Sequence, residues 1–254
     1  MSDDSRPSRP EPRTALRTAA VIPAAGRGVR LGPGAPKALR TLNGTPMLIH
    51  AVRALAASRA VSLVVVVAPP DGAPEVKSLL DAHALPDRTD FLVVPGGESR
   101  QESVRLGLDA LPPDYDIVLV HDAARPLVPV DTVDAVVQAV RDGAPAVVPA
   151  LPLADTVKEV EPAAAPGDPE PVLATPERAR LRAVQTPQGF DRTVLVRAHE
   201  TVTGAVTDDA GMVEQLGERV VVVPGHEEAF KVTRPLDLVL AEAVLARRRL
   251  NDGF

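Results

Sequence analysis

The chain has 254 residues, a net charge of −6 and no cysteine. Disulfides and thiolate-bound metals are therefore excluded as stabilising elements, which suits a reducing compartment, and we expect a cytoplasmic protein. Aromatic residues make up only 2% of the chain, so stacking platforms for single-stranded nucleic acid are nearly absent. The acidic charge also argues against nucleic-acid and membrane-surface partners, and no apolar run approaches the ~20 residues that span a bilayer.

Residues 1–17 are rich in Pro, Arg, Ser and Asp, and this composition predicts a disordered leader. The apolar stretch at 18–25 is short and runs into Pro and Gly, so it does not fit a signal-peptide core. We expect the folded domain to occupy residues 18–249, followed by a short tail at 250–254.

Apolar runs of strand length alternate with segments of helical period over the first 150 residues. The predicted helices lie at 46–58, 99–111 and 131–141, and the predicted buried strands at 18–22, 63–68, 91–94, 116–121 and 146–150. This alternation is typical of an α/β fold with a Rossmann-like, doubly wound and mostly parallel sheet. Because ligands bind at the carboxyl ends of such strands, the loops at 23–37, 95–103 and 122–126 should line one cleft.

The pattern changes after residue 151. A strand-like segment at 155–160 is followed by a Pro-, Ala- and Gly-rich stretch at 161–171, and the strand pattern resumes at 178–186. We interpret residues 152–180 as a protruding β-hairpin arm. Since an isolated two-stranded hairpin is barely stable in water, we expect the arm to pack on a second subunit and form a homodimer.

The last third of the chain returns to alternating elements. We predict a helix at 191–203 and another from Asp208, with Thr207 able to cap it. A strand at 219–223, a short segment at 229–232 and a final helix from Pro235 complete the domain.

The loop after the first predicted strand is rich in Ala and Gly. It matches neither the dinucleotide-binding pattern Gly-x-Gly-x-x-Gly, because Leu31 stands where the third Gly should be, nor a P-loop, because Lys37 precedes Ala38. Small residues let backbone N–H groups approach a triphosphate, and Arg30 and Lys37 could offset its charge. On spacing alone, an ordinary strand-to-helix turn fits this loop equally well.

Five short segments together resemble one enzyme family. Pro23-Ala24-Ala25-Gly26, followed by Arg30 and Pro36-Lys37, resembles the nucleotide loop of sugar-phosphate nucleotidyltransferases. The segments 96–104, 120–126, 185–188 and 231–235 are similar to those of the 2-C-methyl-D-erythritol 4-phosphate cytidylyltransferases. The resemblance runs from residue 19 to about residue 245.

The resemblance implies that CTP and 2-C-methyl-D-erythritol 4-phosphate are joined to give 4-diphosphocytidyl-2-C-methyl-D-erythritol and pyrophosphate, in non-mevalonate isoprenoid biosynthesis. It also implies Mg²⁺ or another divalent cation. The implied catalytic residues are Arg30, Lys37 and Lys231, and the implied nucleotide-binding residues are Pro23, Ala24, Ala25, Gly26, Gly96, Glu98 and Ser103. Many family members carry Asp where this chain has Glu98.

For the sugar-alcohol phosphate, the resemblance implies contacts from Asp122, which also helps to place the metal, and from Thr186 at the cleft floor. Arg125 would contact the substrate or brace its loop. Thr156 and Arg178 in the arm would bind the phosphate in the neighbouring subunit, and either Arg180 or Arg182 could replace Arg178. Lys231 follows the apolar pair Ala229-Phe230 and is expected to face inward, where a charge without an anion would cost several kcal/mol.

Three other functions fit part of the sequence. A CTP-dependent transferase acting on ribitol 5-phosphate or another polyol phosphate would share the same motifs. A transferase for sugar 1-phosphates with another nucleotide is disfavoured by the segment 231–235 and by the short chain. A non-catalytic, regulatory relative should have lost some of the cations at 30, 37, 125 and 231, yet all four are present. The five histidines show no ligand spacing and are interpreted as structural or surface residues.

Overall fold

The computed structural model describes residues 16–26, 36–204 and 206–251, and of Lys37 only the backbone. Arg30 and most of the predicted leader therefore lie outside the described residues. Arg17, by contrast, belongs to the folded body: its guanidinium carbon lies 4.2 Å from the centre of the Tyr115 ring, and Nη2 donates to the Tyr115 hydroxyl at 2.7 Å.

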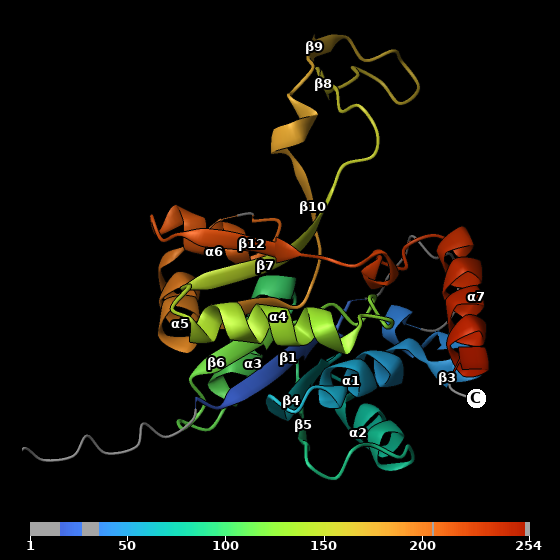
Figure 1. Cartoon of the computed structure of the whole chain (residues 1–254), viewed down its shortest axis with the longest axis vertical. Coiled ribbons are helices and arrows are strands. Elements are labelled where there is room, and N and C mark those ends of the chain that lie inside the picture. The colour runs from blue at the N-terminus through green and yellow to red at the C-terminus, as the bar shows by residue number, and fades with distance from the viewer. Residues whose placement is uncertain (1–15, 27–35, 205, 252–254) are drawn as a thin grey trace, which may run out of the picture.

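Eight strands form one mixed, mostly parallel sheet, as the sequence predicts (Figure 1). β1 pairs in parallel with β4 and β6, β4 with β5, and β7 with β12. One antiparallel strand, β11, joins the two parallel groups because it lies between β6 and β7, and a second antiparallel strand, β10, pairs with β7 alone. The strands are β1 (Thr18–Pro23), β4 (Val61–Ala68), β5 (Asp90–Pro95), β6 (Ile117–Val120), β7 (Ala146–Pro152), β10 (Arg182–Val184), β11 (Gln188–Asp191) and β12 (Val220–Pro224).

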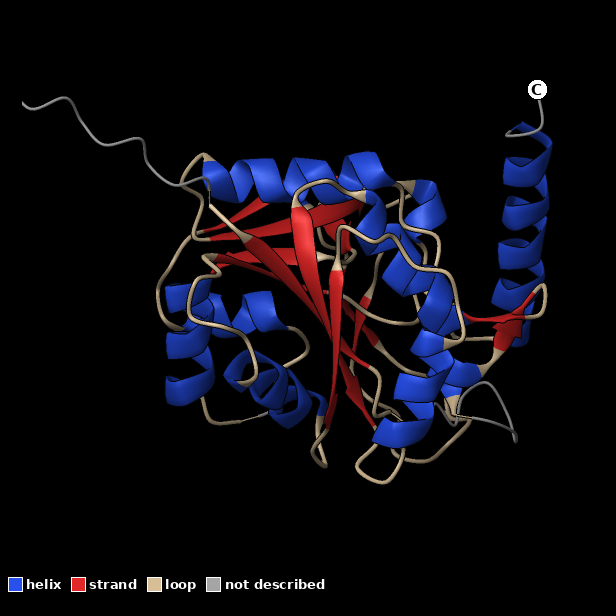
Figure 2. Cartoon of the chain, turned by 90° about the horizontal axis from the view of Figure 1, so that it is seen from below, coloured by secondary structure: helices blue, strands red, loops and turns tan. Residues whose placement is uncertain are grey.

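Helices cover both faces of the sheet (Figure 2). Because successive side chains of a strand point to opposite faces, Ala20 and Ile22 of β1 pack into one apolar cluster while Ala19 and Val21 pack into another. The first cluster contains buried side chains of α1 (Met47–Ala57), α2 (Ala73–Asp81) and α4 (Val130–Arg141). The second contains those of α3 (Arg100–Asp109), α5 (Arg192–Thr201) and α6 (Asp209–Gln215).

Helix α3 approaches the sheet so closely that Gly107 leaves no room for a side chain. A Cβ atom at this position would lie 2.6 Å from Cγ1 of Val21 and 2.9 Å from Cγ2 of Val67. We therefore expect Gly107→Ala to destabilise the protein by about 1–3 kcal/mol, although alanine has the higher helix propensity. Urea denaturation would measure this. Arg105→Ala on the exposed side of the same helix should change stability by less than about 0.5 kcal/mol, and a Gly107→Ala protein more stable than the parent would contradict the packing argument.

The predicted arm projects from the body beyond β7 and β10 (Figure 1). Its antiparallel pair is short, formed by β8 (Glu159–Val160) and β9 (Val172–Ala174), and the turn η3 (Arg178–Arg180) precedes β10. Val172 and Leu173 of β9 are 57% and 61% exposed. The hairpin thus has little packing of its own within the described chain.

Several local predictions differ from the structure. Thr207 does not cap α6: the N-cap is Asp208, whose carboxylate accepts from the N–H of Gly211 at 2.9 Å. The segment at 229–232 continues from the turn η4 (Glu227–Ala229) without joining the sheet. Helix α2 was not predicted, and the last helix, α7 (Pro235–Asn251), passes two residues beyond the expected domain end. It packs near the strand pair β2 (Thr41–Leu42) and β3 (Thr45–Pro46), which follow the turn η2 (Lys37–Leu39).

Among the helices of the described chain, none is both long and apolar enough to cross a membrane.

Candidate active site

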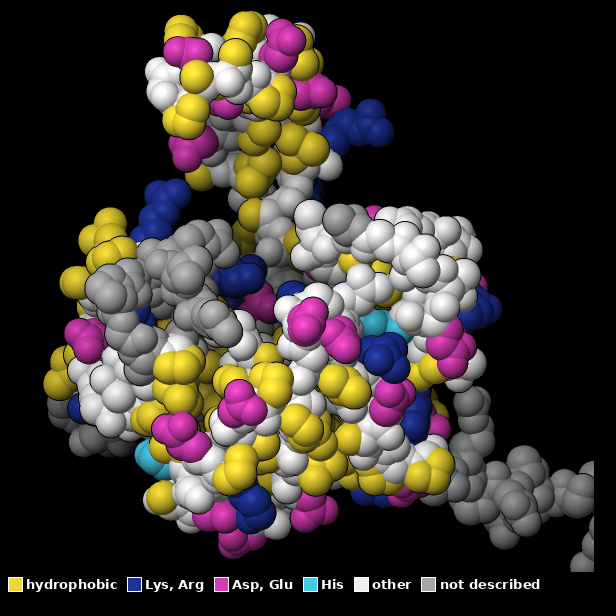
Figure 3. Space-filling model, turned by 180° about the vertical axis from the view of Figure 1, so that it is seen from behind, with side chains coloured by type: hydrophobic (Ala, Val, Ile, Leu, Met, Phe, Trp, Pro, Cys, Tyr) yellow, Lys and Arg dark blue, Asp and Glu magenta, His cyan; other side chains and the backbone are white. Residues whose placement is uncertain are grey.

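Two adjoining pockets lie at the carboxyl ends of the parallel strands, where ligands bind in sheets of this kind. We call the one of about 190 Å³ the first pocket and the one of about 230 Å³ the second pocket. The first is lined by Pro23, Ala25, Gly26, Gly97, Glu98, Ser99, Arg100, Ser103 and Asp122. The second is lined by Arg100, Asp122, Arg125, Val184, Gln185, Thr186, Gln188, Thr207, Asp208 and Lys231. Arg100 and Asp122 belong to both pockets, which therefore form one cleft; Figure 3 shows basic and acidic side chains meeting in a hollow below the arm.

The first pocket is bounded by two loops of small residues. Ala25 and Gly26 line it, whereas Ala24 is buried behind them and donates its N–H to the Val67 carbonyl at 2.8 Å. Gly96 also lies behind the wall, because a Cβ there would be only 2.9 Å from Cβ of Ala25. Of the adjacent glycines Gly96 and Gly97, it is Gly97 that lines the pocket.

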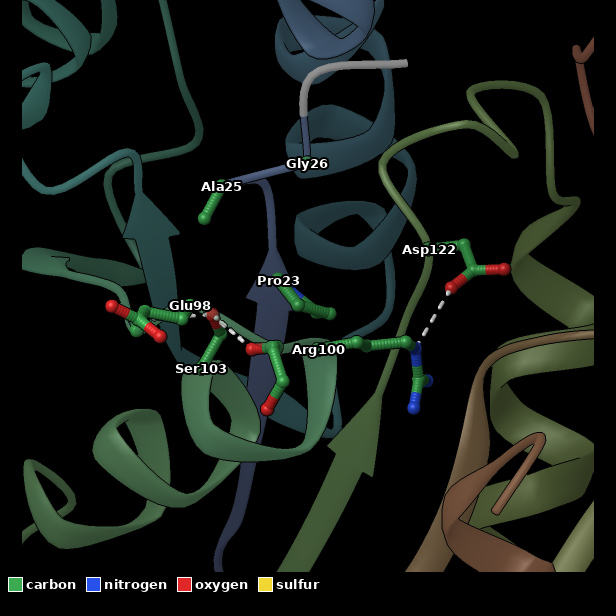
Figure 4. Close-up of a pocket in the computed structure, with 9 residues that line it drawn as sticks. Pro23, Ala25, Gly26, Glu98, Arg100, Ser103 and Asp122 are labelled. Carbon is green, nitrogen blue, oxygen red and sulfur yellow. Dashed lines mark hydrogen bonds and ion pairs between the residues drawn. The ribbon is translucent and has the colours of Figure 1, made fainter. Parts of the chain in front are cut away.

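Ser103 holds the second of these loops in place. Its hydroxyl donates to the Ser99 carbonyl at 2.9 Å and accepts from the N–H of Gly97 at 3.2 Å. The backbone N–H of Glu98 donates to the Glu102 carboxylate at 2.8 Å, while the Glu98 side chain lines the pocket (Figure 4). The loop is thus fixed by α3 before any ligand binds.

Asp122 is the centre of a charge cluster between the pockets. Its Oδ2 lies 2.7 Å from Nζ of Lys231 and 3.9 Å from Nε of Arg125, and its Oδ1 lies 3.7 Å from Nε of Arg100. Burial alone would raise the pKa of Asp122, but the charges of Lys231 and Arg100 outweigh it and lower that pKa to about 2. The carboxylate is therefore ionised throughout the physiological range.

Arg100 is a site residue that the sequence analysis did not single out. It reaches from the first turn of α3 across the cleft towards Asp122 (Figure 4). Its Nη1 also donates to Oδ2 of the buried Asp209 at 2.7 Å, and Oδ1 of Asp209 lies 3.1 Å from Nε2 of His199. Burial lowers the pKa of Arg100, but Asp209 and Asp122 together raise it above its ordinary value. The only sequence signal was its place inside the segment 96–104.

Arg125 is largely occupied within the protein. Its guanidinium donates to the carbonyls of Ala229 at 2.7 Å and Val184 at 3.2 Å. These contacts join the loop after β6 to the segments that carry Thr186 and Lys231. Of the two roles predicted for Arg125, bracing is the one that these contacts favour.

Lys231 differs from the prediction of an inward-facing, buried charge. Its side chain is 40% exposed and paired with Asp122. The apolar neighbours do turn inward: Ala229 is buried and Phe230 packs near α7. The ammonium instead lies at the second pocket, accessible to a ligand.

The remaining predicted residues lie apart from the two pockets or outside the described chain. Thr156 and Arg178 are exposed on the arm and line neither pocket, and Nη1 of Arg178 donates to the Ala154 carbonyl. Arg30 and the side chain of Lys37 lie outside the described residues. Their roles stay predictions.

A divalent cation would find few protein ligands here. No group of three or more Asp, Glu or His side chains is arranged to hold a metal within residues 16–26, 36–204 and 206–251. Asp122 is the one carboxylate shared by both described pockets, and cations already face its two oxygens. This donor set fits Mg²⁺ that is held mainly by phosphate oxygens, with at most one protein carboxylate.

The doubly wound sheet, the small-residue loop after its first strand and the charged cleft define an α/β enzyme of the nucleotidyltransferase class. The model of the 2-C-methyl-D-erythritol 4-phosphate cytidylyltransferase family matches residues 18–247, and the chain belongs to this family. It is 89% identical, over the full length of both chains, to the protein of that name from Streptomyces avermitilis, and 83% identical to that of Streptomyces coelicolor, again over the whole of both.

Solved structures agree with this assignment. The Thermus thermophilus cytidylyltransferase has 34% sequence identity and a TM-score of 0.69, with 90% of this chain and 98% of that chain covered. The 4-diphosphocytidyl-2C-methyl-D-erythritol synthase of Anaerococcus prevotii has 28% identity and a TM-score of 0.74, with 91% and 99% covered.

Proposed function

We propose that this protein joins CTP and 2-C-methyl-D-erythritol 4-phosphate to form 4-diphosphocytidyl-2-C-methyl-D-erythritol and pyrophosphate. The observation that carries the proposal is the pair of pockets sharing Arg100 and Asp122. Two substrates can thus meet at one charge cluster, in a chain 89% identical to a relative named for this reaction.

In this reaction a phosphate-monoester oxygen of the sugar alcohol attacks the α-phosphorus of CTP. The bond from that phosphorus to the β-phosphate oxygen breaks, and pyrophosphate leaves. The nucleophile is already an anion at neutral pH, so no general base is needed. The protein must instead bring two polyanions together and stabilise charge on the α-phosphate, which positioned cations can do.

The first pocket suits the cytidine, because its Ala and Gly walls leave backbone groups accessible to a base edge. The second pocket suits the polyol phosphate, because Asp122 and Lys231 both line it. Asp122 would accept hydrogen bonds from hydroxyl groups, and Lys231 would meet the phosphate. The loop at 23–37 would place Arg30 and Lys37 at the triphosphate. Mg²⁺, when bound to the phosphate oxygens, would neutralise part of the triphosphate charge. Asp122 is the protein carboxylate that would help to hold it.

The charge balance of the described cleft indicates that further cations must come from outside it. Its three cations, Arg100, Arg125 and Lys231, are outnumbered by four carboxylates, those of Glu98, Asp122, Asp208 and Asp209. A triphosphate and a phosphate monoester therefore require further cations. Arg30 and Lys37 would supply two, and we propose that Arg178 supplies a third from the arm of a second copy in a homodimer, where Thr156 would also bind the phosphate. The exposed apolar residues of β9 are consistent with an arm that packs on another chain.

Pyrophosphate release tests the proposed function. The assay contains Mg²⁺ and CTP and compares 2-C-methyl-D-erythritol 4-phosphate, ribitol 5-phosphate and glucose 1-phosphate, with ATP, GTP and UTP as alternative nucleotides. We expect strong turnover only with CTP and the methylerythritol phosphate. A preference for ribitol 5-phosphate would contradict the proposed substrate but not the proposed mechanism. A folded protein that is inactive with every pair of substrates would favour a non-catalytic relative.

A further inference from the structure

His121 is completely buried at the end of β6, immediately before Asp122. Both of its ring nitrogens have partners. Nε2 lies 3.1 Å from the Arg125 carbonyl oxygen, and Nδ1 lies 3.0 Å from the Thr186 hydroxyl. The same hydroxyl lies 3.0 Å from the backbone N–H of Asp122. One imidazole thus connects both ends of the loop at 122–125 to the segment between β10 and β11.

The chemistry of these partners fixes where the hydrogens lie. A carbonyl oxygen can only accept, so the neutral ring must carry its hydrogen on Nε2, and Nδ1 is then an acceptor. The Thr186 hydroxyl must therefore donate to Nδ1, and it accepts from the N–H of Asp122. Burial lowers the pKa of His121 to about 4, which keeps the ring neutral at physiological pH.

This arrangement limits what Thr186 can do in the cleft. A hydroxyl has one hydrogen, and here it is used inside the protein, so Thr186 cannot donate to an ionised phosphate oxygen. Its side chain is also almost completely buried. Thr186 therefore acts on the second pocket indirectly, by holding the loop that carries Asp122.

We infer that His121 is a positioning residue for the proposed reaction: through Thr186 and the Arg125 carbonyl it sets the loop that carries Asp122 and Arg125. This role rests on the proposed function. The loop at 96–99, which forms one wall of the first pocket, is held separately, by the hydrogen bond from the N–H of Gly97 to the Ser103 hydroxyl. Loss of the His121–Thr186 connection should consequently weaken the polyol-phosphate side of the cleft more than the nucleotide side.

Steady-state kinetics of Thr186→Val test whether the polyol-phosphate side is affected more than the nucleotide side, because valine keeps the shape of threonine and removes the hydroxyl. We expect the KM for 2-C-methyl-D-erythritol 4-phosphate to rise at least about tenfold, with less than about threefold change in the KM for CTP. Thr186→Ser keeps the hydroxyl, so its KM for 2-C-methyl-D-erythritol 4-phosphate should stay close to that of the parent protein. His121→Gln, which cannot accept from Thr186 in the same place, should show the same selective rise.

His83 provides a matched control, since its Nδ1 bonds to the Leu79 carbonyl at 2.7 Å, away from the cleft. His83→Gln should leave both KM values unchanged. Equal rises in both KM values for Thr186→Val, or no rise in either, would overturn the positioning role.

An NMR measurement on the unmodified protein keeps the inference separate from the proposed function. Ring ¹⁵N shifts of labelled histidine should show His121 as the tautomer with hydrogen on Nε2. A hydrogen on Nδ1 would overturn the inference even if the enzyme is active. Absence of turnover in the parent protein would instead refute the proposed function, while the tautomer would still decide whether the predicted chain of hydrogen bonds exists.

Discussion

Replacing Lys231 with methionine should lower kcat/KM by at least about two orders of magnitude while the protein stays folded. The Lys231 ammonium lies 2.7 Å from Oδ2 of Asp122, and the side chain is 40% exposed. It can therefore leave Asp122 and meet the incoming phosphate, or charge developing on the α-phosphate. Methionine keeps most of the side-chain volume and removes the charge. Steady-state pyrophosphate release measures the effect, and circular dichroism checks the fold.

Lys77→Met is a matched control for this experiment. Lys77 also pairs with an aspartate, Asp81, at 2.8 Å, but it lies on the exposed side of α2. Because exposed pairs contribute little, this change should leave both turnover and stability nearly unaltered. Turnover of Lys231→Met within about threefold of the parent would refute the catalytic role of Lys231.

The sequence was sufficient to predict the strands β1, β4, β6 and β7, because they are mostly buried and rich in Ala, Val, Ile and Leu. It did not predict β11, which lacks such a run, and β5, which was expected to be buried, is only partly so. It was insufficient for α2, a nine-residue helix that buries only Val76 and Leu80. The cap of α6 could be misplaced by one residue because Thr207 and Asp208 are both good N-caps, and only the bond from Gly211 distinguishes them.

The site was predictable to the extent that its residues lie in short motifs. Asp122, Arg125, Thr186 and Lys231 were all expected in one cleft, and all four line the second pocket. Arg100 was missed because its importance comes from tertiary structure: Asp209, 109 residues further along the chain, pairs with it and directs it across the cleft. The exposure of Lys231 was misjudged for a similar reason, since its partner Asp122 comes from a distant strand end.

The second large effect that we expect is recovery of activity when two inactive subunits are combined. Arg178→Ala removes the proposed phosphate ligand of the arm, and Lys231→Met removes a cation of the cleft. If each arm serves the neighbour's cleft, a hetero-oligomer of these variants has one site with both residues intact and one with neither. Differently tagged subunits, co-expressed and purified through both tags, should therefore show roughly half the activity of the parent, whereas each homo-oligomer is inactive.

The position of the arm within one chain makes recovery of activity a test of a site shared between two subunits. Within one chain, Arg178 and Thr156 are exposed on the arm, and neither lines a pocket that contains Lys231. A site built from one chain alone would lack either Arg178 or Lys231 in every subunit of the hetero-oligomer, and no activity would return. Combining Lys231→Met with Asp122→Asn is the control, because both changes lie in the cleft and should not complement one another. An active Arg178→Ala homo-oligomer would indicate that Arg180 or Arg182 is the phosphate ligand of the arm. An inactive hetero-oligomer would contradict a shared site.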